Sequence, residues 1–554
     1  MLQELNQLGI ALEQDDKLTP TGFSECICHW QIDLILETFM VLETPGKSDK
    51  SKPKFGKKIL VPDLRRNGDE TLLIDDGGEY VFGAGDRGEK RHNLYLQLLG
   101  RCLQETNHEA VKAVYDFVTN TTVEKITAEL VIAYPPAANI EWYRDRFVFM
   151  FNGGQITKIP AIKKWWSNYY ASKQDTIDGV CLLTGEKTPT MGRKMPMMVK
   201  GVPGSMAYGA AISSFDKVAY QSYGWDGNIN APIGFTSAVR FHKALDFLLN
   251  SHTNHYKLGG QVFVYWGEEE GEGINPEIWE NPSFESIFAS PHSPKKFNLE
   301  DIKSSKFYLA VLKGNKGRIS VSSWSEITTQ KIKDSLQQFI QCQQVNNLSP
   351  VPIWMLCNTA FLNHSKENTD RIATALIKAA FLGEKLPDEY AYRIIDRICS
   401  EKSFHPFPSQ SRKHFYFPRL QGLLLYLATN NMKYPTDHPG LNTAYTLGRI
   451  AFLMHQSQLN AQSMTEDNTN VMRSLKALSS TPTQVFARLC HGCTHYHLEA
   501  EKSKYIKLLL AEEFENFDIS VLPEVLDLKS QALFFQGWWQ KRAEFFKPKD
   551  KSEQ

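Results

Sequence analysis

No stretch of this 554-residue sequence approaches the ~20 consecutive apolar residues that a transmembrane helix needs. The longest apolar runs, such as 423–427, have the length of a core segment. The opening residues are acidic and amphipathic and lack the basic-then-apolar profile of a secretory signal. Cysteine is scarce, with nine residues spread along the chain, and this odd number favours reduced thiols over disulfide bridges. We therefore expect a cytoplasmic protein that has no membrane partner.

The sequence also lacks an excess of charge of either sign, because 62 Lys and Arg residues balance 62 Asp and Glu residues. No overall positive field attracts nucleic acid, so any such binding must come from local basic patches. Hydrophobic residues at 42% and charged residues at 22% are typical of a globular chain and exclude a disordered or fibrous one. At this length we expect three or four folded units.

Signatures of common catalytic sites are absent. We find no GxSxG nucleophile elbow, no phosphate-binding GxxxxGK[ST] loop, no HExxH pair and no GxGxxG motif after a strand. A helicase or nuclease would need a nucleotide-binding loop or clustered carboxylates for a metal, and neither is visible. We therefore expect no catalytic residue and no cofactor.

One segment near the C-terminus resembles a metal site, because Cys490, Cys493, His495 and His497 fall within eight residues. Thiolates and imidazoles are the ligands that tetrahedral zinc prefers. The same residues lie in a continuous helical pattern, however, and ligands adjacent on one helix do not converge easily. Buried free cysteines are the favoured interpretation, and we expect no metal.

The pattern of apolar residues predicts an α+β protein. A mixed α/β N-terminal domain, 1–180, precedes a strand-rich domain with glycine-rich loops, 181–330, and an all-α helical bundle, 331–554. Strand-like apolar patterns predict strands over 146–151, 260–266 and 307–312. Helical spacing of apolar residues predicts a helix over 236–249. Helical spacing predicts further helices over 372–382, 388–399, 420–428, 441–456, 483–497, 504–514 and 532–546. We expect Trp165 and Trp166 to pack in the core or between domains and not to stack on bases.

A basic segment over 46–66 changes the local composition sharply, and Gly, Ser and Pro interrupt it. Lys57, Lys58, Arg65 and Arg66 are candidates for phosphate contacts. A solvated surface loop explains the same charges equally well.

A second unusual segment runs from Lys200 to Pro232 and is rich in glycine. Gly201, Gly204 and Gly209 permit left-handed turns and close backbone approach. Such loops can present N–H groups and amides to a phosphate or a base edge. The alternative is a tight structural turn that lets two strands cross, and composition alone favours it.

The ordered motifs along the chain resemble the large subunit of the type I-C (Dvulg subtype) CRISPR interference complex. They are Cys181…Thr184-Gly185, Lys200-Gly-Val…Gly209-Ala210, Ser214-Phe215…Ser222-Tyr-Gly224, Asn230-Ala-Pro232, Val262-Phe-Val-Tyr-Trp266, Gly317-Arg-Ile-Ser-Val321, Pro387…Arg393-Ile…Arg397-Ile398, Ala444-Tyr-Thr-Leu-Gly-Arg449, Ser480-Thr-Pro482…Val485-Phe486 and Gln531…Phe534…Gly537-Trp-Trp-Gln-Lys-Arg542. Two segments depart from the family pattern. Residues 205–209 replace a more polar loop, and Gly227-Asn228 replaces a Gln-Gly pair.

The resemblance implies a subunit without chemistry of its own. Such a subunit recognises the protospacer-adjacent motif on double-stranded target DNA, helps to open the duplex into an R-loop, and holds the crRNA 5′ end. Its implied partners are the crRNA, the CRISPR-associated backbone and crRNA-processing subunits, and a helicase-nuclease that docks after R-loop formation. A further partner is a small subunit made from an internal start, which the part from about 430 to 554 resembles.

Site residues follow from the resemblance and from the loops together. We expect contacts to DNA or to the protospacer-adjacent motif from five residues of the glycine-rich segment: Lys200, Ser205, Tyr208, Asn228 and Asn230. Arg318 joins Lys57, Lys58, Arg65 and Arg66 as a candidate phosphate contact. Arg412, Lys413 and Arg419 are weaker candidates to follow the displaced strand, and a solvated face is favoured for them.

Two other functions remain open. One is a metal-dependent hydrolase that uses the cluster over 490–497. The other is an assembly scaffold that makes no DNA contact, for which the balanced charge is the argument.

Overall fold

The computed structural model describes residues 1–15, 17–42, 56–64, 68–221, 223–268, 271–274, 305–344, 348–362, 368–404, 417–432, 443–462, 468–500, 503–515 and 517–547. The chain forms two compact units. The N-terminal unit comprises Leu2–Met198 and Ser213–Leu245, and the C-terminal unit comprises Val199–Ile212 and Asp246–Gln554, with Met1 assigned to it. The boundaries expected at 180 and 330 do not coincide with these units.

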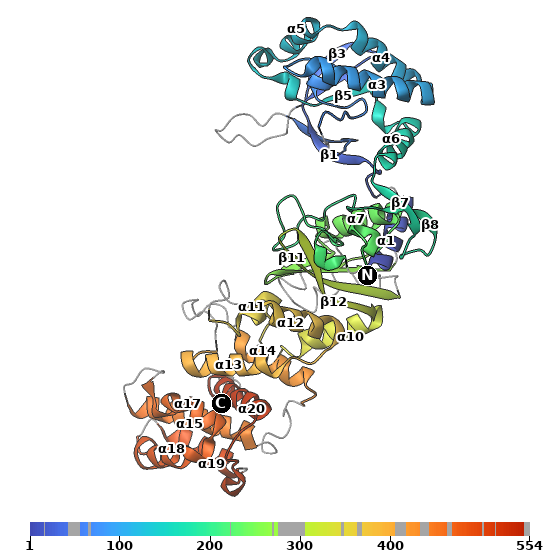
Figure 1. Ribbon diagram of the computed structural model, residues 1–554. Helices are drawn as coiled ribbons and strands as arrows, with labels where there is room; N and C mark the ends of the chain where they lie inside the picture. The colour runs from blue at the N-terminus through green and yellow to red at the C-terminus, as the bar shows by residue number, and fades with distance from the viewer. Residues whose placement is uncertain are drawn as a thin grey trace. The chain divides into compact units, whose positions relative to one another are not determined.

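The N-terminal unit is built on a four-stranded sheet of order β3-β2-β5-β6. Its strands are β2 (Trp30–Asp33), β3 (Thr38–Val41), β5 (Phe147–Phe151) and β6 (Gly154–Gln155), and β2 pairs with β5 in parallel. Apolar residues of this sheet form one core with helices α3 (Gly88–Thr106), α4 (Glu109–Asn120), α5 (Val123–Ala133) and α6 (Pro160–Ser172) (Figure 1). Trp165 and Trp166 of α6 are buried in it, as predicted.

Two antiparallel ribbons accompany this sheet. β1 (Phe23–Cys28) pairs with β4 (Lys57–Pro62), and β7 (Thr176–Val180) pairs with β8 (Lys187–Met191). The remaining helices are α1 (Leu2–Gln14), the single turn α2 (Gly78–Val81) and α7 (Phe235–Asn250), which crosses the division between the units. The strand and helix predicted over 146–151 and 236–249 are confirmed by β5 and α7.

The C-terminal unit begins with an antiparallel sheet of order β12-β11-β10-β9. Its strands are β9 (His255–Leu258), β10 (Gln261–Gly267), β11 (Lys306–Asn315) and β12 (Arg318–Thr328). β10 is buried along its whole length. One side of the sheet contacts a helix, where the Tyr265 and Phe381 ring centroids lie 5.3 Å apart, and Trp266, Tyr308 and Trp324 form an aromatic cluster.

From Thr329 onward every element that the structure describes is helical. The α-helices are α10 (Thr329–Gln341), α11 (Ile353–Asn358), α12 (Asp370–Leu382), α13 (Asp388–Glu401), α14 (Pro418–Thr429), α15 (Thr443–Ala461), α16 (Asn470–Arg473), α17 (Leu475–Ser480), α18 (Phe486–Gly492), α19 (Lys504–Glu515) and α20 (Leu528–Phe545). These confirm the predicted helices, except that a π-helical turn over Cys493–His497 continues α18.

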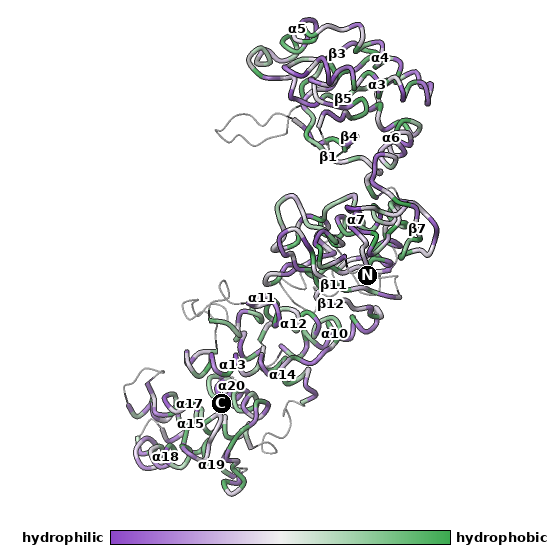
Figure 2. Tube along the Cα trace, in the orientation of Figure 1, coloured by the Kyte–Doolittle hydropathy of each residue, from purple (hydrophilic) through white to green (hydrophobic). Residues whose placement is uncertain are grey.

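A single cluster of buried apolar residues runs from Tyr256 on β9 to Trp538 on α20, so the sheet and the helices share one core. The α+β class predicted from the sequence is confirmed. In Figure 2, hydrophilic residues interrupt the hydrophobic stretches along the helices. Among the helices in the described ranges, none combines the length and the apolar character needed to cross a bilayer.

Candidate nucleic-acid interface

The glycine-rich loop over 199–212 is closed on itself by backbone hydrogen bonds. Val199 and Ala210 exchange N–H···O bonds of 3.0 and 2.9 Å, and the Gly209 N–H donates to the Met206 carbonyl at 2.9 Å. Gly201 and Gly204 adopt left-handed conformations, with φ of 82° and 80°. Since residues with a Cβ seldom adopt these angles, glycine is what permits the loop to fold so tightly.

The closed loop lies against the tip of the hairpin formed by β11 and β12. The tip is the two-residue turn Lys316-Gly317, and Lys316 itself has a φ of 54°. Backbone hydrogen bonds of 2.8 to 3.1 Å join the two segments at both ends. They run from Gly314 N to Pro203 O, Lys316 N to Gly204 O, Met206 N to Lys316 O, Ala211 N to Gly317 O and Ile319 N to Ala211 O. The loop therefore extends the hairpin as additional paired backbone.

Two glycines make this close approach possible. A Cβ built on Gly204 would lie 2.5 Å from the carbonyl oxygen of Gly314, and a Cβ on Gly314 would overlap the backbone nitrogen of Ser205. Real Cβ atoms do not come this near to backbone atoms, and backbone cannot turn aside as a side chain can. The glycines thus form a tight structural turn, the interpretation that composition alone favoured. The same turn also brings predicted site residues close to the hairpin.

We expect Gly204→Ala to detach the loop from the hairpin. Gly201→Ala is the matched control, because Gly201 has the same left-handed φ but no atom within 4 Å of its added Cβ. Both variants carry about 1 kcal/mol of backbone strain, and only the first adds an overlap of ~1–3 kcal/mol. Amide hydrogen exchange in 199–212 should therefore accelerate roughly 5- to 100-fold more in Gly204→Ala. Equal acceleration in both variants would contradict the backbone contact.

The junction presents cations and an aromatic ring to solvent. Lys200 and Lys316 are exposed, Arg318 is half-buried, and 63% of the Tyr208 side chain is accessible. Burial raises the pKa of Asp246 and the Lys200 ammonium lowers it, which places Lys200 near that carboxyl. The Ser205 hydroxyl donates to the Val202 carbonyl at 2.5 Å, so it holds the loop turn. Of the predicted residues, Lys200, Ser205, Tyr208 and Arg318 thus belong to one surface, which we call the junction surface.

The lysines of the basic segment lie elsewhere, at the start of β4. Lys57 and Lys58 pair with Cys28 and Ile27 of β1, and both lysines are exposed. Successive side chains on a strand point to opposite faces, so the two lysines do not form one clamp on the same phosphate. Arg65 and Arg66, like most of the segment over 46–66, lie outside the described residues.

The two predicted asparagines occupy interior positions of the turn that follows the loop. Asn228 is fully buried, and neither polar atom of its side chain has a partner among the described residues. Asn230 donates from Nδ2 to the carbonyls of Trp225 and Gly227, at 2.9 and 3.0 Å. In this arrangement neither asparagine presents its amide donor to a base edge. Asn230 shapes the turn, and a base edge would reach Asn228 only if the segment moved.

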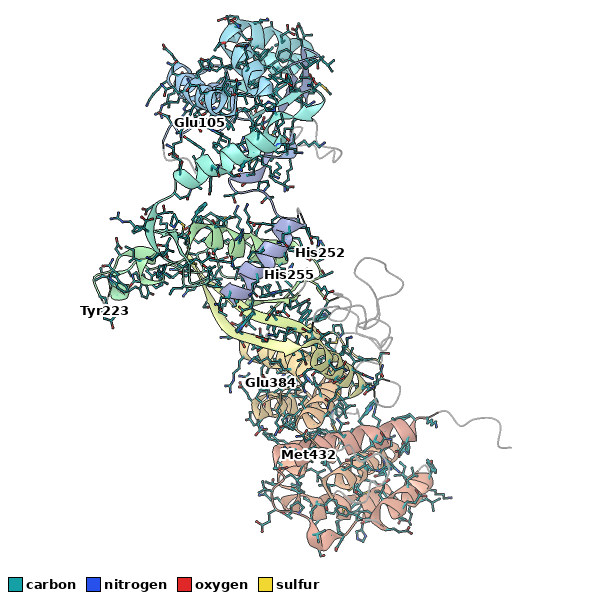
Figure 3. The ribbon with its side chains drawn as sticks, turned by 90° about the vertical axis from the view of Figure 1, so that its right-hand side faces the viewer. Glu105, Tyr223, His252, His255, Glu384 and Met432 are labelled. Atoms are coloured by element: carbon teal, nitrogen blue, oxygen red, sulfur yellow. The ribbon has the colours of Figure 1, made fainter. Side chains whose placement is uncertain are left out.

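The same turn exposes aromatic side chains that the sequence analysis did not select. Tyr223 and Trp225 are 84% and 51% exposed, and their ring centroids are 6.0 Å apart. Figure 3 shows Tyr223 at the outer end of its loop, directed away from the rest of its unit. Gln221 donates to Asp226 at 3.0 Å, and Arg193 forms a 3.4 Å ion pair with the same carboxylate. The signal in the sequence was the density of aromatics in a glycine-rich turn.

Comparison with family models identifies the chain. The model described as CRISPR-associated protein (Cas_Csd1) matches residues 5–546, nearly the whole sequence. The chain belongs to the Cas_Csd1 family. A search of curated proteins gives no match. Membership in this family supports a role as the large subunit of a Cascade-type complex that acts with other Cas proteins. The resemblance found in the sequence is thereby confirmed at the level of the family. The type I-C subtype stays a prediction.

One weaker candidate of this Cas_Csd1 chain is wrong, because Arg419 is not on a surface. Its side chain is fully buried at the start of α14, where it donates to the Ser403 carbonyl at 2.8 Å and pairs with Glu401. Burial lowers its pKa to about 9. A guanidinium held in this way joins α13 to α14 and cannot follow a DNA strand. Arg412 and Lys413 lie outside the described residues.

The cysteine and histidine cluster of the Cas_Csd1 chain does not converge. Cys490 is half-buried, Cys493 and His497 are buried, and His495 is exposed with its ring beside that of His491. Burial raises the pKa of Cys490 to about 12 and also raises that of Cys493, so both thiols stay protonated. Within the described part of the chain, no group of three or more Cys, His, Asp or Glu side chains is arranged to hold a metal ion. The geometry therefore gives no support to a hydrolase built on this cluster.

Proposed function

We propose that this Cas_Csd1 protein is the non-catalytic large subunit of a crRNA-guided DNA surveillance complex in the cytoplasm, and that its junction surface recognises the protospacer-adjacent motif. One observation carries this proposal. Residues from two separate parts of the chain, 199–212 and 314–319, are joined by paired backbone into one cationic surface. A surface fixed by backbone bonds can place Lys200 and Lys316 on phosphates and Tyr208 against a groove.

The balanced overall charge suits this role. Guide and target strands read most of the sequence by base pairing, so the protein needs to read only a few base pairs. A small basic patch gives modest, salt-dependent affinity and allows scanning. In the same proposal the subunit holds the crRNA 5′ end, contacts the backbone and crRNA-processing subunits and the small subunit, and supplies the docking surface for the helicase-nuclease.

The test uses the complex assembled with crRNA and its partner subunits, and duplexes with a randomised flanking motif. We expect Lys200→Gln and Lys316→Gln to weaken binding to all duplexes and to reduce the salt slope by about 0.9 for each lost phosphate contact. Tyr208→Ala should instead change the preferred motif, by roughly 5- to 100-fold for the favoured base pair. Lys507→Gln, an exposed lysine on α19, is the matched control.

Unchanged motif preference and salt slope in all three variants would contradict recognition by the junction surface and would favour the scaffold. A uniform loss in Tyr208→Ala, equal on matched and mismatched motifs, would show that Tyr208 only positions the DNA.

The exposed aromatic pair suits the opening step. An unstacked base gains about 1–3 kcal/mol by stacking on an aromatic side chain. We expect Tyr223→Ala and Trp225→Ala to reduce opening beside the motif by roughly 10-fold or more, measured by 2-aminopurine fluorescence, while initial duplex affinity stays the same. Tyr392→Ala, which removes an aromatic side chain 57% exposed on α13, should leave opening unchanged. Normal opening in both loop variants would exclude stacking by this pair.

A further inference from the structure

A pocket of about 340 Å³ opens in the helical part of the C-terminal unit. Side chains of α15, α16, α18 and the π-helical turn over Cys493–His497 line it. Its volume lies at the lower end of the ~300–1,000 Å³ typical of small-ligand sites. No Asp or Glu is among its lining residues, whereas Arg473 and Arg488 both are. The pocket therefore has positive charge that nothing in its lining neutralises.

The two arginines come from different helices, and both line the pocket. Arg473 ends α16 and Arg488 lies within α18, and both side chains are exposed. Neither guanidinium makes a hydrogen bond or an ion pair with any residue that the structure describes. A guanidinium offers a planar fork of donors that matches the oxygens of a phosphate. Two such groups lining one pocket are suited to one phosphate group.

Deeper in the pocket the lining is neutral. His497 is only 7% exposed and has no hydrogen-bond partner among the described residues. Burial lowers its pKa, so the imidazole is uncharged and can both donate and accept. Cys493 lies beside the Ser457 hydroxyl at 3.1 Å, and burial raises its pKa, so no thiolate repels an anion there.

Apolar side chains complete the wall. Met454, Val471 and Leu489 line the pocket and are each less than 10% exposed. These features of the pocket match groups of a nucleotide. The cations suit its phosphate, the neutral donor and acceptor suits the edge of its base, and the apolar wall suits the face of its base. We propose that this pocket binds a nucleoside monophosphate group, with the phosphate on Arg473 and Arg488 and the base against Met454, Val471 and Leu489.

This site goes beyond motif recognition, because it uses no residue of the junction surface. The nucleotide can be free or part of a single strand, and the two sources differ in what they leave outside the pocket. A free monophosphate places its charge on the arginines and nothing beyond them. A strand continues past both sides of the mouth, where further phosphates add salt-dependent affinity.

The test uses the full-length chain and four probes: inorganic phosphate, free AMP, a short single-stranded oligonucleotide and the same oligonucleotide with one abasic position. Binding is followed by calorimetry and fluorescence anisotropy, and the site is mapped by hydrogen exchange. Arg473→Gln and Arg488→Gln should each weaken nucleotide binding roughly 10- to 100-fold. Lys507→Gln, which replaces an exposed lysine on α19 outside the pocket, should not, which separates this pocket from the general charge.

Three outcomes support the proposal or decide its source. Binding of AMP and oligonucleotide, both lost in the arginine variants with protection of α15 and α18, supports a site for the free group and the strand. Oligonucleotide binding alone, with the same losses, assigns the pocket to a strand. Weaker binding of the abasic probe supports the base subsite.

Two outcomes overturn it. Inorganic phosphate that binds as tightly as AMP would show an anion site without a base subsite. Affinities that are the same in wild type and both arginine variants, with their melting temperatures unchanged, would show that the pocket binds no nucleotide. Fold integrity is checked by those melting temperatures, because both arginines are exposed and their replacement leaves the core intact.

Discussion

Gly537→Ala is expected to loosen the crossing of α15 and α20 and to destabilise the helical part of the C-terminal unit severely. A Cβ built on Gly537 overlaps the carbonyl oxygen of Tyr445, and one built on Gly448 overlaps the carbonyl oxygen of Phe534. The two glycines therefore let backbone touch backbone. Overpacking a core costs ~1–3 kcal/mol when side chains can move, and more when they cannot, so we expect a loss above about 3 kcal/mol.

Gly492→Ala is the matched control for this prediction. Gly492 is helical, in α18, and an added Cβ there meets no atom within 4 Å. Alanine in an open helical position stabilises by roughly 0.5–1 kcal/mol. Unfolding in urea is monitored by hydrogen exchange of peptides from α15 and α20, and it gives an unfolding midpoint for each of the two variants. A midpoint for Gly537→Ala equal to that of Gly492→Ala would show that the helices do not meet as closely as the structure has them.

Arg449→Met should produce the second large loss of stability. Arg449 on α15 donates to Glu513 of α19 at 2.8 and 2.9 Å and to Glu544 of α20 at 2.8 and 3.0 Å. Lys541 adds a 2.7 Å ion pair to Glu513, and the side chains of Arg449, Glu513 and Lys541 are each no more than 10% exposed. Removing one member of a buried network leaves charge unpaired, at a cost of about 3–5 kcal/mol.

A surface pair in the same unit provides the comparison. Arg371 pairs with Glu389 at 3.1 Å, but its side chain is 79% exposed. Solvent screens such a pair, and Arg371→Met should cost less than about 1 kcal/mol. The double variant Arg449→Met with Glu513→Leu should recover part of the loss, since it removes the excess negative charge that Arg449→Met leaves beside Lys541. Similar unfolding midpoints for Arg449→Met and Arg371→Met would contradict a buried network.

The network also predicts a pH dependence. Burial raises the pKa of Glu513, but the hydrogen bonds from Arg449 and Lys541 outweigh it and hold the pKa below its ordinary value. An unfolded glutamate titrates near ~4.3. The stabilisation is therefore present above that pH and is lost as the pH falls through the lower folded pKa. The free energy of unfolding of wild type, measured in urea at several pH values, should therefore fall in acid. In Glu513→Gln the free energy of unfolding should depend less on pH.

Much of the fold follows from local patterns. The helical spacing of apolar residues predicted α12, α13, α14, α15, α19 and α20 within a few residues, because each helix buries a face whose period is set by its own geometry. The helix predicted over 441–456 is α15, and it is buried nearly all around. Local patterns did not predict the exposure of some single side chains. Arg419 is charged and yet fully buried, whereas Tyr223 is aromatic and yet exposed.

The candidate site shows the same division. Glycine spacing in 199–212 indicated a tight loop, and the φ values of Gly201 and Gly204 confirm it. Nothing local indicated that the loop would pair with 314–319, more than 100 residues further along the chain. Likewise, Asn228 and Asn230 have the side chains that contact base edges, and only the folded turn shows that one is buried and the other bonded to backbone.

By itself the sequence determined the class of the fold, the places of most helices and strands, and the family resemblance, because these depend on residue order and on short-range periodicity. Only the tertiary structure decided which charged groups face solvent and which are locked inside. It also decided that one core spans sheet and helices, that Gly448 and Gly537 seat two helices on each other, and that Arg473 and Arg488 share a pocket. Those facts arise from contacts between segments distant in sequence, whose energies depend on where the whole chain places them.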